Sequence, residues 1–188
     1  APGQRIKTLY KTWADCGAAF NLTGNVMVDK RAMGEPFCVV LENEDYLDDL
    51  REWAEIGQSG GTQLWMQINH PGRQAQKKYN KDVVAPSAVK LEQKGLFTTP
   101  RPLEEKEVWE LIERYGRAAE LAKMTGFSGV QIHGAHGYLV SQFLSPRTNK
   151  RTDDWGGKLE NRARFLLEVF RNIRAKVGAA FPISVKIN

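Results

Sequence analysis

The chain has 188 residues, of which 41% are hydrophobic and 26% are charged, with a formal net charge of +5 at pH 7. This length and composition predict one globular domain with a sizeable core. The charge is too small and too scattered for a nucleic-acid-binding surface, and no apolar run approaches the roughly 18–20 residues that cross a bilayer.

The two cysteines and the N-terminus bear on the compartment. Cys16 and Cys38 belong to no CxxC pair and no zinc pattern, and the first residues lack the architecture of a signal peptide. A reducing compartment is the simplest interpretation, so we expect a cytoplasmic protein, although the sequence leaves a disulfide open.

The N-terminal half predicts two helix–strand pairs. Apolar residues at helical spacing predict a helix over 3–16, followed by a strand over 19–23. A second helix is expected to start at 43–45, where acidic residues suit the positive end of the helix dipole. It ends at Gly60, and a strand over 62–69 follows.

The C-terminal half repeats the pattern after a long polar connection over 71–102. That connection exceeds an ordinary loop, so we expect it to fold into a small excursion or lid. Helices are then predicted over 103–124 and 159–177, each followed by a strand, over 130–133 and 182–187.

Strands that alternate with helices predict βαβ units and a parallel sheet. No GxGxxG loop follows any strand, which argues against a dinucleotide-binding Rossmann domain. We therefore expect an α/β chain of the TIM (β/α)8-barrel type. Only four strands are predicted where a complete barrel has eight, so residues 1–188 would form a partial barrel domain.

Polar residues gather where the predicted strands end. Alternation places Gln67 and Asn69 opposite Leu64, Met66 and Ile68, and the strands that contain His133 and Lys186 show the same division. The apolar faces should meet the helices, and the polar faces should point into the barrel. Burying such side chains is costly unless a partner satisfies them, so we expect a large, flat, polar-edged ligand at this end.

Two histidines at HxxH spacing leave a metal alternative open. His133 and His136 could bind one zinc ion with His70 as a third ligand, as in a zinc-dependent hydrolase. The strand ends supply no acidic residue to complete such a site, and no HExxH motif occurs.

One long stretch resembles a known family. Residues 129–139, Gly-Val-Gln-Ile-His-Gly-Ala-His-Gly-Tyr-Leu, and the motifs that follow as far as Arg162 resemble the active-site strand and loop of the Old Yellow Enzyme family. Asn69-His70-Pro71-Gly72-Arg73 is similar to that family's HxGR segment. The segments 84–88 and 23–28 are similar to its other loops, so the resemblance covers essentially the whole chain.

The resemblance implies an FMN-dependent ene-reductase. In that family, NAD(P)H gives a hydride to the flavin, which passes it to the activated alkene of an enone. By resemblance, His133 and His136 would bind the substrate carbonyl oxygen, and Tyr138 would donate a proton to the α-carbon. Gln67 would bind the flavin pyrimidine edge. Lys186 would lie near flavin N1, and Gly24 would let the backbone approach the ring.

These residue types suit the chemistry that the family performs. Hydride addition to an enone builds negative charge on oxygen, which two positioned imidazole donors stabilise as an oxyanion hole does. A phenol with a pKa of about 10 stays protonated at neutral pH and can act as the acid.

The chain departs from the family pattern in two respects. Lys186 stands where many members have arginine, which keeps the charge but loses the planar fork. The family's first strand and its phosphate-binding strands find no counterpart here, so this chain is expected to be a fragment, corresponding to the stretch from the first helix to the fifth strand and possessing no flavin phosphate site. A non-enzymatic half-barrel that self-associates as a homo-oligomer through its open edges is the other interpretation.

Overall fold

The computed structural model describes residues 1–93 and 95–188, so one position of the predicted 71–102 excursion lies outside the described residues. It contains five α-helices: α1 Gln4–Asp15, α2 Leu47–Gly57, α3 Glu105–Met124, α4 Leu139–Leu144 and α5 Leu159–Val177. Two 3-10 turns are η1 Ser59–Gly61 and η2 Gly72–Gln74. The strands are β1 Phe20–Met27, β2 Val39–Val40, β3 Gln63–Asn69, β4 Val84–Ala85, β5 Arg101–Pro102, β6 Gly129–Gly134 and β7 Ile183–Ile187.

The main sheet is parallel, as the alternation of helices and strands predicted. Its strand order is β2-β1-β3-β6-β7, so the four predicted strands are neighbours in chain order. This is the arrangement of successive βα units in a barrel wall. The carboxyl ends of β1, β3, β6 and β7 therefore lie along one edge, which we call the rim.

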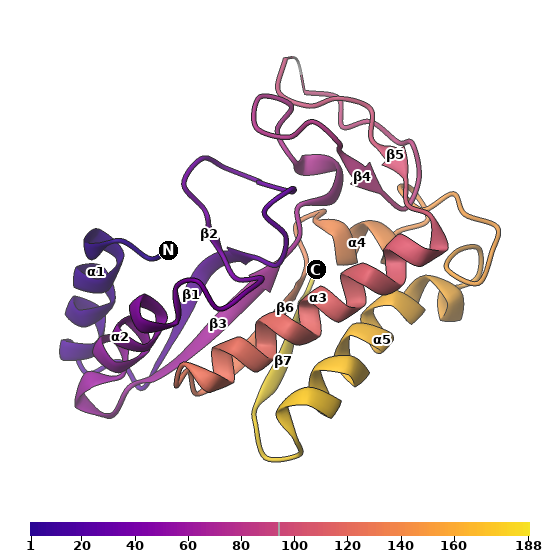
Figure 1. The fold of residues 1–188 in the computed structure, drawn as a ribbon. Helices are drawn as coiled ribbons and strands as arrows, with labels where there is room; N and C mark the ends of the chain where they lie inside the picture. Colours follow the sequence, from indigo (N-terminus) through magenta and orange to yellow (C-terminus); the bar gives the residue numbers. More distant parts are fainter. Residues whose placement is uncertain (94) are drawn as a thin grey trace.

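The helices cover one face of the sheet. Leu64, Met66 and Ile68 of β3 are fully buried in the same core as Tyr115 of α3 and Phe165 of α5. Figure 1 shows α3 and α5 running side by side along the sheet. The predicted apolar face is confirmed for β3 and β6 because burial of these side chains drives the helices onto the strands.

β7 departs from that expectation. Val185 is 36% exposed and Ile187 is 63% exposed, although both lie on the apolar face of this strand. β7 is at the edge of the sheet, and α5 packs mainly against α3. Self-association through such an edge stays a prediction, which sedimentation of the purified chain can check.

Local chemistry fixes where two helices begin. α3 starts with a capping box, in which Glu104 and Glu107 each accept a hydrogen bond from the backbone of the other. The prediction that α2 starts at 43–45 is wrong, since α2 begins at Leu47. Asn43 instead closes a turn by accepting a hydrogen bond from the Asp45 N–H at 3.2 Å, and this competes with helix formation.

The first strand is longer than predicted. β1 continues to Met27 because a bulge between Leu22 and Asn25 inserts one extra residue and restores the pairing with β3. The extra residue breaks the two-residue alternation, so the sequence pattern ended the strand too early. The count of four strands also missed β2, β4 and β5, which have two residues each and are too short to show a period.

The polar connection after β3 contains short regular elements. It contains η2 and a small parallel sheet of β4 and β5. In Figure 1 this segment projects beyond the rim, in the magenta and pink part of the chain. None of the helices that the structure describes is long and apolar enough to cross a membrane.

Candidate active site

Two rows of inward side chains cross the sheet near the rim. The strand register pairs Asn25 with Gln67, Gln67 with Gln131, and Gln131 with Ser184. One step closer to the rim, Met27 pairs with Asn69 and His133 pairs with Lys186. The structure therefore contains the predicted polar face, and residues from β1, β3, β6 and β7 lie on it.

The lower row is a hydrogen-bonded ladder. Gln67 Nε2 donates to Gln131 Oε1 at 2.8 Å, and Gln131 Nε2 donates to Ser184 Oγ at 3.2 Å. Gln67 is almost fully buried, so its amide is held rigidly. The sequence placed Gln131 on the correct face but gave it no role, because its partners come from other strands.

The bulge in β1 contains Gly24, which directly precedes Asn25 of the lower row. Thr23 Oγ1 accepts a hydrogen bond from the Gln67 N–H at 2.9 Å and donates to the Gly24 carbonyl at 2.8 Å. The Gly24 N–H donates to Tyr10 Oη at 2.9 Å, and Tyr10 in turn donates to the Leu22 carbonyl. A Cβ added to Gly24 would meet no atom within 4 Å, so a flat ligand can approach the backbone here.

His133, His136 and Tyr138 form an aromatic cluster where β6 ends. The His133 ring lies edge-on to the other two, with ring centroids 5.0 Å from His136 and 4.8 Å from Tyr138. His133 is buried, Tyr138 is half-buried and His136 is exposed. The structure thus brings together the three residues that the resemblance assigned to substrate chemistry.

His133 is held in one protonation state. Burial, followed by the positive charges of His136 and Lys186, lowers its pKa to about 4. Its Nδ1 accepts the Ala135 N–H at 3.3 Å. The neutral ring must therefore carry its proton on Nε2, which makes Nε2 a hydrogen-bond donor at neutral pH.

Tyr138 faces a cavity of about 300 Å3 beside the bulge. Gly24, Asn25, Glu35 and Cys38 also line it. Burial raises the pKa of Tyr138, and the negative charge of Glu35 adds to that effect. The phenol therefore keeps its proton at neutral pH.

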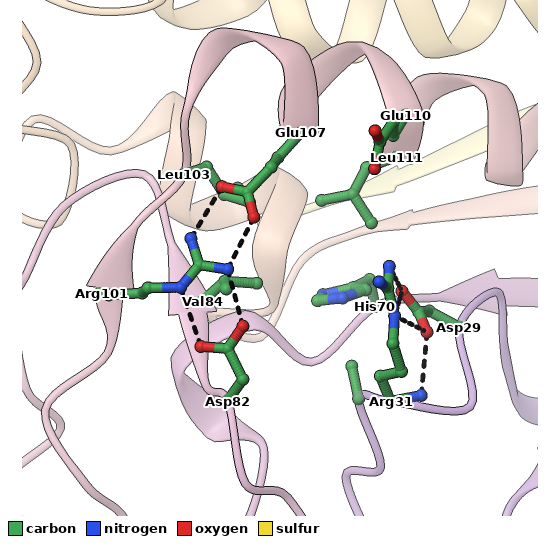
Figure 2. A pocket seen from close by; sticks show the side chains of 11 residues that line it. Asp29, Arg31, His70, Asp82, Val84, Arg101, Leu103, Glu107, Glu110 and Leu111 are labelled. Atoms are coloured by element: carbon green, nitrogen blue, oxygen red, sulfur yellow. Dashed lines mark hydrogen bonds and ion pairs between the residues drawn. The ribbon is translucent and has the colours of Figure 1, made fainter.

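The His70 side chain lines a different cavity from the one that Tyr138 lines. Its Nδ1 accepts the Gly72 N–H at 3.1 Å, and complete burial lowers its pKa to about 4. Figure 2 shows His70 beside the Asp29–Arg31 ion pair, in a cavity of about 70 Å3 under α3.

On the other side of that cavity, Arg101 forms ion pairs with Asp82 and Glu107, as Figure 2 also shows. The two arginines that line this cavity, Arg31 and Arg101, are therefore both paired with carboxylates. Across residues 1–93 and 95–188, no three histidine, cysteine or acidic side chains are placed to hold a metal ion. The zinc alternative consequently lacks a ligand set in the described structure.

Sequence reasoning gave no role to three amide side chains that contact the loop after β6. Gln74 donates to the His136 carbonyl, Asn188 accepts the His136 N–H, and Gln142 donates to the Gly137 carbonyl. These contacts span 62, 52 and 5 residues of chain, and the two longer ones leave no local signal.

Comparison with known proteins decides the family. Residues 3–188 match the family model described as the NADH:flavin oxidoreductase / NADH oxidase family. The chain belongs to this family. It is 36% identical to the NADH-dependent flavin oxidoreductase iliE of Hypocrea jecorina, with 100% of the chain matching 51% of that protein. It is 39% identical to the NADH oxidase of Thermoanaerobacter brockii, where 98% of the chain matches 29% of the relative.

Solved structures agree on the fold. An Old Yellow Enzyme homologue from Zymomonas mobilis superposes with a TM-score of 0.90 at 27% identity, over 100% of this chain and 54% of its own. A 2-naphthoyl-CoA reductase also gives 0.90, at 32% identity, over 96% of this chain and 29% of its own. The partial TIM-barrel fold predicted from the sequence is confirmed. This flavin oxidoreductase family member spans about half, or less, of the length of the relatives that it matches.

Proposed function

We propose that this chain forms the substrate-binding part of an FMN-dependent oxidoreductase that reduces the activated C=C bond of α,β-unsaturated carbonyl compounds with NAD(P)H. The observation that carries the proposal is the cluster of His133, His136 and Tyr138 at the rim, in which the His133 ring centroid lies 5.0 Å from that of His136 and 4.8 Å from that of Tyr138. Family membership supports the flavin chemistry, and the cluster supports the substrate class.

The two histidines would bind the substrate's carbonyl oxygen. His133 offers an Nε2–H donor because its Nδ1 is already an acceptor. His136 lies next to it and is open to solvent, so one oxygen atom can contact both rings. Donors that are fixed in place stabilise the charge that develops on that oxygen, and removing one typically costs about 10²–10³ in rate.

Tyr138 would supply the proton for the α-carbon. Its raised pKa keeps the phenol protonated, and its position on the cavity of about 300 Å3 gives a ligand access to the ring. Proton donation by a placed side chain contributes about 10²–10⁴ in rate.

The rim residues fit a flavin ring. Gly24 leaves open space over its backbone, and Gln67 uses its amide N–H on Gln131, which leaves its carbonyl oxygen for a ligand N–H. Lys186 would place a positive charge beside the ring, which favours its reduced form. Bound FMN would supply the hydride transfer that amino-acid side chains cannot perform.

Either NADH or NADPH is the proposed reductant. Several relatives are named NADH-dependent flavin oxidoreductases, whereas others are named NADPH dehydrogenases. Parallel assays with both nucleotides decide between them. The relative named as a 2-naphthoyl-CoA reductase makes an aromatic thioester a useful second substrate in those assays.

A titration of the purified chain with FMN tests the cofactor, and product analysis tests the reaction. We expect a saturable change in the visible flavin spectrum. We also expect NADH labelled with deuterium at C4 to place deuterium on the β-carbon of 2-cyclohexen-1-one. Flavin binding with NADH consumption that is independent of the enone would refute the substrate class. An unchanged flavin spectrum, together with a stable dimer in sedimentation, would favour the self-associating half-barrel.

A further inference from the structure

His136 has a backbone conformation that is uncommon for any residue other than glycine. Its φ is +56°, and within the described residues only Phe37 shares a positive φ without being glycine. A residue with a side chain is strained in this left-handed region, and such a conformation persists only where the surroundings enforce it. This backbone strain is located at a residue whose ring is part of the candidate active site.

Two amide side chains from distant elements hold the backbone of His136. Gln74, at the end of η2, donates from Nε2 to the His136 carbonyl at 2.8 Å. Asn188, directly after β7, accepts the His136 N–H on Oδ1 at 2.8 Å. The backbone N–H and the backbone carbonyl of His136 are therefore both hydrogen-bonded to side chains, which come from segments after β3 and β7, the two neighbours of β6.

The next peptide is held as well. Gln142 of α4, which is 1% exposed, donates to the Gly137 carbonyl at 2.7 Å and to the Pro71 carbonyl at 3.0 Å. Gly137 has a φ of +72°, and a Cβ there would lie 3.0 Å from Gln74 Nε2. The loop after β6 is thus fixed to the loop after β3 by two glutamines.

We propose that Gln74 and Asn188 are positioning residues that hold His136 in its left-handed conformation, so that its ring stays beside His133 and the two imidazoles act as a pair. Without these two bonds the His136 backbone would relax to a more favourable φ and carry the ring away from His133. The catalytic consequence rests on the proposed function, but the conformational one does not.

The two amides use opposite chemistry, which allows a matched test. Gln74 acts as a donor, so Gln74→Glu replaces the N–H with an oxygen of the same shape and breaks the bond. Asn188 acts as an acceptor, so Asn188→Asp keeps the bonding oxygen, whereas Asn188→Leu removes it. Gln74 is half-buried and Asn188 is exposed, so all three variants should fold.

Nuclear magnetic resonance of the chain without flavin gives the first readout. The chain has three histidines, so selective labelling yields three imidazole systems, with buried His70 as an internal control. We expect a cross-relaxation signal between the His133 and His136 rings in the parent chain and in Asn188→Asp. The signal should be weak or absent in Gln74→Glu and Asn188→Leu, with the His70 signals unchanged.

Enone reduction by the flavin-loaded protein gives the second readout. We expect kcat/KM to fall by about 10- to 100-fold in Gln74→Glu and Asn188→Leu, because a misplacement of about 1 Å can cost 10² in rate. It should stay within about threefold in Asn188→Asp, which keeps the acceptor.

The outcomes separate the two proposals. Retention of the ring–ring signal in Gln74→Glu and Asn188→Leu would overturn the positioning role, as would an equal loss in Asn188→Asp and Asn188→Leu. If the ring signals change as expected while no variant or parent reduces an enone, the positioning role stands and the proposed function fails.

Discussion

The ring of Tyr138 meets the ring of His133 edge-on, with centroids 4.8 Å apart and planes at 88°. One residue is a phenol whose pKa is raised by burial, and the other is an imidazole that burial keeps neutral. In the proposed function, Tyr138 is the proton donor and His133 is a hydrogen-bond donor for the same carbonyl compound, and the two rings lie side by side. Because the two residues have different proposed roles, substitutions can test each role separately.

Tyr138→Phe should slow only the step that consumes the alkene. We expect flavin reduction by NADH to keep its rate, and enone reduction to fall by about 10²–10³ because the α-carbon loses its proton donor. Stopped-flow measurement of the two half-reactions checks this. Tyr79→Phe is the matched control, since Tyr79 is 42% exposed in the excursion. Equal slowing of both half-reactions would argue against proton donation by Tyr138.

Acid should destabilise the fold through two buried histidines. His70 and His133 both have a pKa of about 4 in the folded chain, against about 6.5 when unfolded. The unfolded chain therefore binds more protons between these values, so stability is complete above pH 6.5 and falls as the pH drops towards 4. Each residue contributes on the order of 3 kcal/mol to this loss.

Urea unfolding across this pH range measures the effect. His70→Asn and His133→Asn should each reduce the slope of unfolding free energy against pH by one proton, and the double variant should reduce it by two. Slopes that equal that of the parent chain would show that these histidines are already protonated in the fold.

Gly72 should tolerate no side chain. It has a φ of +56°, and an added Cβ would lie 2.3 Å from Oε1 of the buried Gln142. We expect Gly72→Ala to lower the free energy of unfolding by about 3 kcal/mol or more, because strain and overpacking add.

Gly17→Ala is the control for Gly72→Ala. Gly17 has a φ of +78° but open space around it, so only the backbone cost of about 1 kcal/mol remains. Equal losses in the two variants, measured by urea unfolding, would remove the steric argument.

Asn69 should be a site where stability can be gained. Its side chain is fully buried, yet neither amide atom has a hydrogen-bond partner in the described structure. Asn69→Leu keeps the shape and removes the unsatisfied groups, so we expect the free energy of unfolding to rise by about 1–3 kcal/mol.

Asn80→Leu should have the opposite effect. Asn80 is also buried, but its amide bonds the backbone of Met33 on both sides and the Gln76 carbonyl. Its loss should lower the free energy of unfolding by about 1–3 kcal/mol. A decrease in both variants would mean that Asn69 has a partner.

The sequence by itself determined the elements and their faces. The helical spacing of apolar residues predicted α1, α3 and α5 to within about two residues at each end, and alternation placed Gln67 and His133 on the inner face of the sheet. Periodicity is local, because each residue's face follows from its near neighbours in the chain. The motif around His133 was likewise readable as a continuous string.

Only the tertiary structure decided the backbone conformation and the hydrogen bonds of the residues on that inner face. The bulge before Asn25, the separation of His70 from the other histidines, and the hold of Gln74 and Asn188 on His136 all depend on strands that meet across 40 residues or more. Hydrogen bonds between such distant residues leave no period in the sequence, because either partner would look the same without the other. The sequence therefore specifies which side chains reach the rim, and packing decides the backbone conformation in which they are held.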